Sequence, residues 1–217
     1  MRNVPRVSNV ATIASIRLSA ACVIVAGLWV QAWADLTYGT FTWAQLPGFF
    51  TPVAALAGIL ALVCAAVAGA REPHWVSLLR VNAATYAVIT GVVYWTLLAQ
   101  HVHPKVPWAN VILHGGAGIL LAADWLVVGP RRRLPWHTIW TVLAIPAMWL
   151  GYLGLRAAHD GWVPYPFLDP ALGAAKIAGT IAVMMAAGLA VAAALRSCTA
   201  LRFVGIADAT TEVRVPA

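Results

Sequence analysis

The stretch VPWANVILHGGAGILLAADWLVVGPRRR, residues 106–133, decides the fold class of this chain. It begins beside a proline, continues for about 20 mostly apolar residues and ends in three arginines, which is typical of a helix that crosses a lipid bilayer. Two ionisable residues interrupt it, His114 and Asp124. Ionisable side chains are costly inside a membrane, so these two are candidates for a function or for a buried ion pair.

The composition of the whole chain supports the same interpretation. Of its 217 residues, 62% are hydrophobic and only 10% are charged, and the mean hydropathy is +0.82. A soluble domain carries about a quarter charged residues, so this chain needs lipid around it. The formal net charge of +7 comes from arginines between hydrophobic runs. Because they form no basic stripe with interleaved aromatic residues, a nucleic-acid partner is not expected.

Six segments are long and apolar enough to span a membrane. The predicted spans are residues 11–33, 51–70, 80–100, 108–129, 136–158 and 173–195. A backbone in hydrocarbon must satisfy its own hydrogen bonds, so each span is predicted to be an α-helix. The fold class is therefore all-α, a polytopic bundle of six transmembrane helices in residues 1–196. Residues 197–217 are predicted to be a poorly ordered cytoplasmic tail.

The arginines predict the orientation of the bundle. They precede the first span, flank the loop between spans 2 and 3, fill the loop between spans 4 and 5, and follow the last span. These are Arg2, Arg6, Arg71, Arg80, Arg131, Arg132, Arg133, Arg196, Arg202 and Arg214. The alternate loops hold far fewer cations. By the positive-inside rule, both termini are cytoplasmic, and the chain is a multi-pass protein of the cell membrane.

Two polar side chains are predicted at similar depths in the outer half of the bundle, counting about 1.5 Å per residue from the inner helix ends. His114 lies in the fourth span, and Thr51 precedes Pro52 at the start of the second. The Thr-Pro pair predicts Thr51 as N-cap and Pro52 as the first helical residue. Thr51 is then either a cap alone, or a nucleophile activated by His114 beside N–H groups that hold an oxyanion.

Three more residues are candidates for the surroundings of this pair. Asn110, four residues before His114, shares its helix face and could orient the imidazole. Gly115 could admit a neighbouring helix or an acyl chain, although ordinary small-residue helix packing is the simpler explanation. The loop GWVPYPFLDP, residues 161–170, could cover the outer mouth and bring the Tyr165 hydroxyl near the site. The alternative is a rigid turn.

Asp124 is predicted to have a structural role. It lies about 15 Å along the helix axis from His114, too far to be the direct third member of a triad. Arg17 lies equally deep in the first span, so the economical interpretation is a buried Arg17–Asp124 pair that fixes the first helix against the fourth. The alternative is that Asp124 carries protons. No metal or cofactor is expected, because the cysteines lack metal-ligand spacing and a bis-histidine haem needs a second histidine inside a span.

Four patches, in order along the chain, resemble a known family. They are GFFTPVAALAG (48–58), TGVVYWTLLA (90–99), WANVILHGGAGILLAADWL (108–126) and GWVPYPFLDP (161–170). Together they resemble the androgen-induced-gene family of six-helix membrane proteins, whose animal members hydrolyse fatty acid esters of hydroxy fatty acids. The resemblance covers about residues 11–195, and the chain looks like a bacterial member.

The resemblance implies that Thr51 is the nucleophile and that His114 is its partner. Thr42 is a rival for the first role, but it would lie roughly 13 Å further out if the segment were helical. The chain departs from the family pattern where relatives carry polar residues, at Ala54, Ala55 and Val111.

Two functions of different classes follow. The first is an integral membrane hydrolase of lipid-like esters, in which Thr51 attacks the ester carbonyl and His114 takes its proton. The second is a non-catalytic membrane protein that binds lipid or a partner, and Ala54 and Ala55 favour it. A transporter is less consistent with the sequence, since no inverted repeat is visible. The expected partners are membrane lipids or a lipid-like ester.

Overall fold

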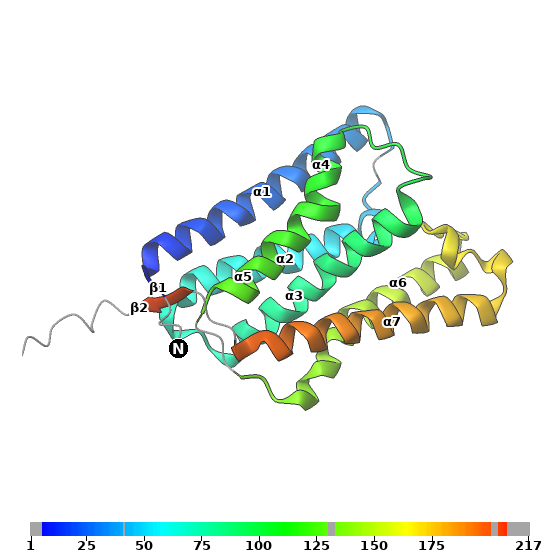
Figure 1. Ribbon diagram of the computed structural model, residues 1–217. Helices are drawn as coiled ribbons and strands as arrows, with labels where there is room; N and C mark the ends of the chain where they lie inside the picture. The colour runs from blue at the N-terminus through cyan, green and yellow to red at the C-terminus, as the bar shows by residue number, and fades with distance from the viewer. Residues whose placement is uncertain (1–5, 41, 130–132, 201–203, 208–217) are drawn as a thin grey trace, which may run out of the picture.

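The computed structural model describes residues 6–40, 42–129, 133–200 and 204–207, and this part of the chain is a bundle of helices (Figure 1). The α-helices are α1 (Val10–Thr37), α2 (Phe50–Ala68), α3 (His74–Val93), α4 (Pro107–Val111), α5 (Ala117–Val127), α6 (Ala144–Asp160) and α7 (Ala174–Ser197). Two π-helical turns, η3 (Tyr94–Leu98) and η4 (Ile112–Gly116), continue α3 and join α4 to α5. Short 3₁₀ segments are η1 (Leu46–Gly48), η2 (Gly69–Arg71), η5 (Trp136–Leu143), η6 (Pro166–Leu168), η7 (Pro170–Leu172) and η8 (Cys198–Ala200).

The six predicted spans correspond one to one with helical stretches that are long and apolar enough to cross a membrane. These are Val10–Thr37, Phe50–Arg71, His74–Leu98, Pro107–Val127, Trp136–Asp160 and Ala174–Ser197. Large apolar side chains lie on the outside of the bundle, among them Trp29, Val67 and Val183, which are 70–84% exposed. An outer surface of this kind is unfavourable in water and favourable in lipid. The length and composition of these six helices therefore indicate a multi-pass membrane protein.

The third helix begins earlier than predicted, at His74 instead of residue 80. The segment before residue 80 follows a polar break and contains Ser77, which is typical of a loop, yet Ser77, Arg80 and Asn82 are all buried. Arg80 was predicted as the first residue of the third span, flanking the loop before it, but it lies inside α3, so that placement is wrong. Several other arginines of that argument, Arg2, Arg131, Arg132, Arg202 and Arg214, lie outside the described residues.

Helix α3 is the centre of the bundle and packs against α2, α5 and α7. Ala54 and Ala55 of α2 are buried in apolar clusters with Ala83 and Ala84 of α3. Small residues bring helix backbones close together, which is the usual basis of helix packing in lipid. Helices α6 and α7 lie on the other side of α3 from α1 (Figure 1).

The first and last segments that the structure describes meet at one end of the bundle. Strand β1 (Arg6–Asn9) pairs in parallel with strand β2 (Val204–Ala207), with Arg6 opposite Val204 (Figure 1). We call this the terminal end, and we call the opposite end, which carries the loops 38–49, 99–106 and 161–173, the distal end. Of the predicted tail at 197–217, β2 is thus ordered by pairing, while 201–203 and 208–217 lie outside the described residues.

Candidate active site

The start of α2 differs from the predicted Thr-Pro cap. Phe49 is the N-cap and makes no side-chain capping hydrogen bond, so Phe50, Thr51 and Pro52 are the first three helical residues. The prediction that Thr51 caps the helix and that Pro52 comes first is therefore wrong. Proline is tolerated at Pro52 because N–H groups of the first turn have no partner within the helix. The Thr51 side chain is consequently not used as a cap.

The Thr51 hydroxyl contacts His114 instead. Its Oγ1 lies 3.0 Å from His114 Nε2, although the two residues are 63 positions apart in the chain. The other ring nitrogen, Nδ1, lies 3.1 Å from the carbonyl oxygen of Asn110. A carbonyl oxygen only accepts, so in the neutral imidazole Nδ1 carries the proton and Nε2 presents its lone pair to the Thr51 hydroxyl. This is the orientation that a general base for Thr51 requires.

Helix η4 explains how His114 reaches this position. His114 lies in the π-helical turn Ile112–Gly116, where the regular α-helical spacing is interrupted. Single π-turns inside α-helices occur frequently at functional sites, because they redirect one side chain without breaking the helix. The second π-helical turn, η3, begins at Tyr94, whose ring stacks on the His114 ring with 3.9 Å between centroids. Two π-helical turns therefore meet at the imidazole.

Asn110 fixes the imidazole by a different route from the one predicted. Its backbone carbonyl, and not its side chain, accepts from His114. Its side-chain Nδ2 donates to Tyr94 Oη over 2.9 Å, and both residues are buried. Asn110 thus holds the stacking tyrosine as well as the ring nitrogen. Tyr94 was not predicted as a site residue, although it lies in the TGVVYWTLLA patch.

An apolar cavity opens beside the Thr51–His114 pair. It encloses about 110 Å³ and extends from Thr51, His114 and Tyr94 to side chains of α6 and α7 such as Leu150 and Met185. Its lining is almost wholly apolar, so it suits a hydrocarbon chain. Ala54 and Ala55 do not line it, since both are buried against α3.

The loop 161–173 supplies part of the distal wall of this cavity. Tyr165 is 8% exposed, lines the cavity, and accepts a hydrogen bond at Oη from the Phe50 N–H over 2.9 Å. Burial raises the pKa of Tyr165 to about 12, so its hydroxyl is neutral at physiological pH. Trp162 of the same loop packs on Gly48, where an added Cβ would overlap the indole. The loop therefore packs closely on the start of α2.

Two other candidates lie away from the cavity. A Cβ on Gly115 would approach Trp95 at 3.8 Å, an ordinary contact, and Gly115 does not line the cavity. The close approach is instead at Gly91, where a Cβ would lie 2.7 Å from the His114 carbonyl oxygen. Thr42, the rival nucleophile, is in the exposed loop before η1 and does not line the cavity either.

The first turn of α2 leaves one N–H group beside the nucleophile. The Phe49 N–H donates to the Leu46 carbonyl, the Phe50 N–H donates to Tyr165, and Pro52 has no N–H. Within this turn, the Thr51 N–H is the remaining donor that cannot bond within the helix. An oxyanion next to Thr51 would therefore find one backbone donor there, fewer than the sequence analysis expected.

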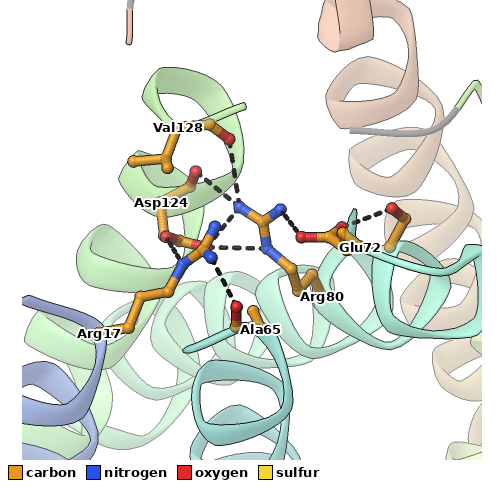
Figure 2. Close-up of polar contacts among 7 residues, drawn as sticks. Arg17, Ala65, Glu72, Arg80, Asp124 and Val128 are labelled. Carbon is orange, nitrogen blue, oxygen red and sulfur yellow. Dashed lines mark hydrogen bonds and ion pairs between the residues drawn. The ribbon is translucent and has the colours of Figure 1, made fainter. Parts of the chain in front are cut away.

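The predicted contact between Arg17 and Asp124 is present and is part of a larger buried network. Arg17 Nε lies 2.8 Å from Asp124 Oδ1, and Arg17 Nη1 donates to the Ala65 carbonyl (Figure 2). Arg80 binds the other carboxylate oxygen of Asp124, with its Nε at 2.9 Å, and also reaches Glu72 at 2.7 Å. Two guanidinium groups and two carboxylates therefore balance in charge.

This network joins four segments near the terminal end and lies away from the cavity. Arg17 comes from α1, Glu72 from the residue after η2, Arg80 from α3 and Asp124 from α5 (Figure 2). Arg17, Glu72 and Arg80 are each 2% exposed, so the charges are desolvated and depend on one another. Glu72 and Arg80 were not predicted as members of the network, because Glu72 was in the predicted loop and Arg80 was the first residue of the predicted third span. The depth of Arg80 follows from the start of α3 at His74.

Comparisons with protein-family models, curated proteins and solved structures find no match for this chain. Its function is therefore inferred from its own residues. The geometry offers a hydroxyl and an imidazole in contact, a ring stacked on the imidazole, and an apolar cavity beside both.

Proposed function

We propose that this protein is a membrane-embedded threonine hydrolase of lipid-like esters, with Thr51 as nucleophile and His114 as general base. The observation that carries the proposal is the 3.0 Å contact between Thr51 Oγ1 and His114 Nε2 at the edge of an apolar cavity. A hydroxyl is a weak nucleophile until an adjacent base takes its proton. The proposal includes kinship with the androgen-induced-gene family, which the four sequence patches support.

The reaction would proceed in two halves. Thr51 Oγ1 attacks the carbonyl carbon of the ester as its proton passes to His114 Nε2. The tetrahedral intermediate then collapses, and the leaving alcohol takes that proton from His114. Water attacks the acyl-threonine ester and gives a proton to His114. The second collapse returns this proton to Thr51 Oγ1 and releases the carboxylic acid.

Surrounding residues would keep the base in its working orientation. The Asn110 carbonyl holds the proton on Nδ1, and the Tyr94 ring restricts rotation of the imidazole. We further propose that both termini are cytoplasmic, which would place the pair in the outer half of the membrane. Substrate would then enter laterally from the outer leaflet of the cell membrane, with its acyl chain in the cavity.

A fluorophosphonate probe tests the mechanism on the full-length protein in detergent. We expect the probe to label the wild type, and labelling to be lost in Thr51→Ala and in His114→Gln. Thr96→Ala is the matched control, because Thr96 lies outside the cavity and its hydroxyl donates only to the Val92 carbonyl. Label that survives Thr51→Ala unchanged would refute Thr51 as the nucleophile.

Lipid binding without turnover is the second candidate function. Ala54 and Ala55 favour it, because they stand at positions where members of the resembled family carry polar residues near the nucleophile. A panel of fatty esters of different chain length separates the two candidates. Stoichiometric binding of a fatty ester with no release of acid would establish the second candidate, and acid release that depends on Thr51 would establish the first.

A further inference from the structure

Thr90 of α3 has a buried hydroxyl that nothing in the described structure binds. The residue is 7% exposed, and its Oγ1 has no hydrogen-bond partner among the described residues. It lines the same cavity as Thr51 and His114. A buried polar group without a partner is unfavourable, because it has lost its hydrogen bonds to water. Such a group in a ligand cavity is therefore expected to bind a polar atom of the ligand.

Other threonines of the same helical stretch show that this state is unusual. Thr85 Oγ1 donates to the Val81 carbonyl over 2.8 Å, and Thr96 Oγ1 donates to the Val92 carbonyl over 2.7 Å. Both use the carbonyl four residues earlier, which is the standard partner for a threonine within a helix. Thr90 does not make the equivalent bond to Tyr86. Its hydroxyl remains available although a local acceptor is within the same helix.

Packing places Thr90 at the same level of the bundle as the Thr51–His114 pair. Its neighbour Gly91 approaches the His114 carbonyl so closely that a Cβ would lie 2.7 Å from it. Tyr94, four residues after Thr90 and the first residue of η3, stacks on the His114 ring. His114 therefore packs between the levels of Gly91 and Tyr94, and Thr90, which precedes Gly91, lines the same cavity as His114.

We propose that the Thr90 hydroxyl donates a hydrogen bond to the carbonyl oxygen of the bound ester and to the oxyanion that forms from it. This inference rests on the proposed function and extends it. The first turn of α2 provides one backbone donor, the Thr51 N–H, whereas oxyanion sites of acyl-transfer enzymes commonly combine two donors. Thr90 supplies the second from a different helix, and it makes no covalent bond in the reaction.

Thr90→Val tests this role, because valine has the same shape and lacks the hydroxyl. With p-nitrophenyl decanoate as substrate, we expect kcat to fall about 100-fold, the loss that follows removal of one oxyanion donor. The midpoint of thermal unfolding should not fall, since the hydroxyl forms no hydrogen bond with the described residues. Thr96→Val, the same change one and a half turns away and outside the cavity, should keep wild-type kcat. A kcat for Thr90→Val within about threefold of wild type would overturn the inference.

A second measurement separates this inference from the proposed function. The ester, labelled with ¹³C at its carbonyl, is bound to Thr51→Ala and to Thr51→Ala/Thr90→Val, and its infrared carbonyl stretch is compared. We expect a lower frequency in the single variant, because a donated hydrogen bond weakens the C=O bond. Equal frequencies would overturn the role of Thr90 whether or not the wild type turns over ester. A wild type without turnover, combined with the frequency shift, would overturn hydrolysis and leave Thr90 as the carbonyl-binding residue.

Discussion

Replacing Asp124 by asparagine should destabilise the protein strongly without touching the cavity. Asp124 accepts from Arg17 at 2.8 Å and from Arg80 at 2.9 Å, and both arginines are 2% exposed. Asp124→Asn leaves two buried guanidinium groups with one remaining carboxylate, Glu72. Removing one partner of a buried ion pair costs about 3–5 kcal/mol. At about 2–4 °C per kcal/mol for a chain of this size, the unfolding midpoint should fall by roughly 6–20 °C.

The assay is thermal unfolding of the detergent-solubilised protein, followed by near-ultraviolet circular dichroism. Asp35→Asn is the matched control: Asp35 lies 3.7 Å from Lys105, and both side chains are about one-third exposed. Loss of such an exposed pair costs less than about 1 kcal/mol. Arg17→Met added to Asp124→Asn should recover part of the loss, because it leaves Arg80 paired with Glu72. A midpoint for Asp124→Asn equal to that of Asp35→Asn would refute the argument.

The double variant Arg17→Met/Asp124→Asn tests whether Asp124 is structural or carries protons. If Asp124 is structural, the folded double variant should hydrolyse ester at the wild-type rate. Loss of turnover in the folded variant would favour proton transfer by Asp124. Gly91→Ala should lower the unfolding free energy by about 1–3 kcal/mol and reduce turnover, because its Cβ would clash with the His114 backbone. Gly151→Ala is the control, since a Cβ there meets nothing within 4 Å. For Tyr165 the folded pKa, about 12, is above its ordinary value near 10. The neutral, buried Tyr165 hydroxyl contributes to folding stability below pH 10, and this contribution declines as pH rises towards 12. Denaturant titrations over this pH range should therefore show a smaller loss of unfolding free energy in Tyr165→Phe than in the wild type.

The sequence predicted the spans well because hydrophobic length is a property of consecutive residues. Each of the six predicted spans overlaps one helical stretch, and the largest error is the start of α3. That start was missed because the segment before residue 80 follows a polar break and contains Ser77, while the burial of Ser77, Arg80 and Asn82 depends on partners from other segments. Ser77 and Arg80 both bind Glu72, and Asn82 donates to Thr141. Such pairings are not visible in local hydropathy.

The site was predicted in part for a similar reason. Depth along the helix axes can be counted from the sequence, and this counting brought Thr51 to the level of His114. Rotation about each axis cannot be counted where π-helical turns occur, because such a turn changes the angular position of all later residues. The roles of Tyr94 and of the Asn110 carbonyl therefore required coordinates. Thr90 required them too, since its missing hydrogen bond is a property of the packed helix.

The parallel pairing of β1 with β2 has a consequence for biosynthesis. Strand β1 precedes the six helical stretches and is translated before them, whereas β2 is translated after the last of them. The pair can form only after every helix has been inserted, and only if both strands are on the same side of the bilayer. An even number of inserted helices is thus a condition for closing this ladder. A chain that skipped one span would keep the two strands apart and would expose unpaired edges, which quality-control proteases and chaperones recognise.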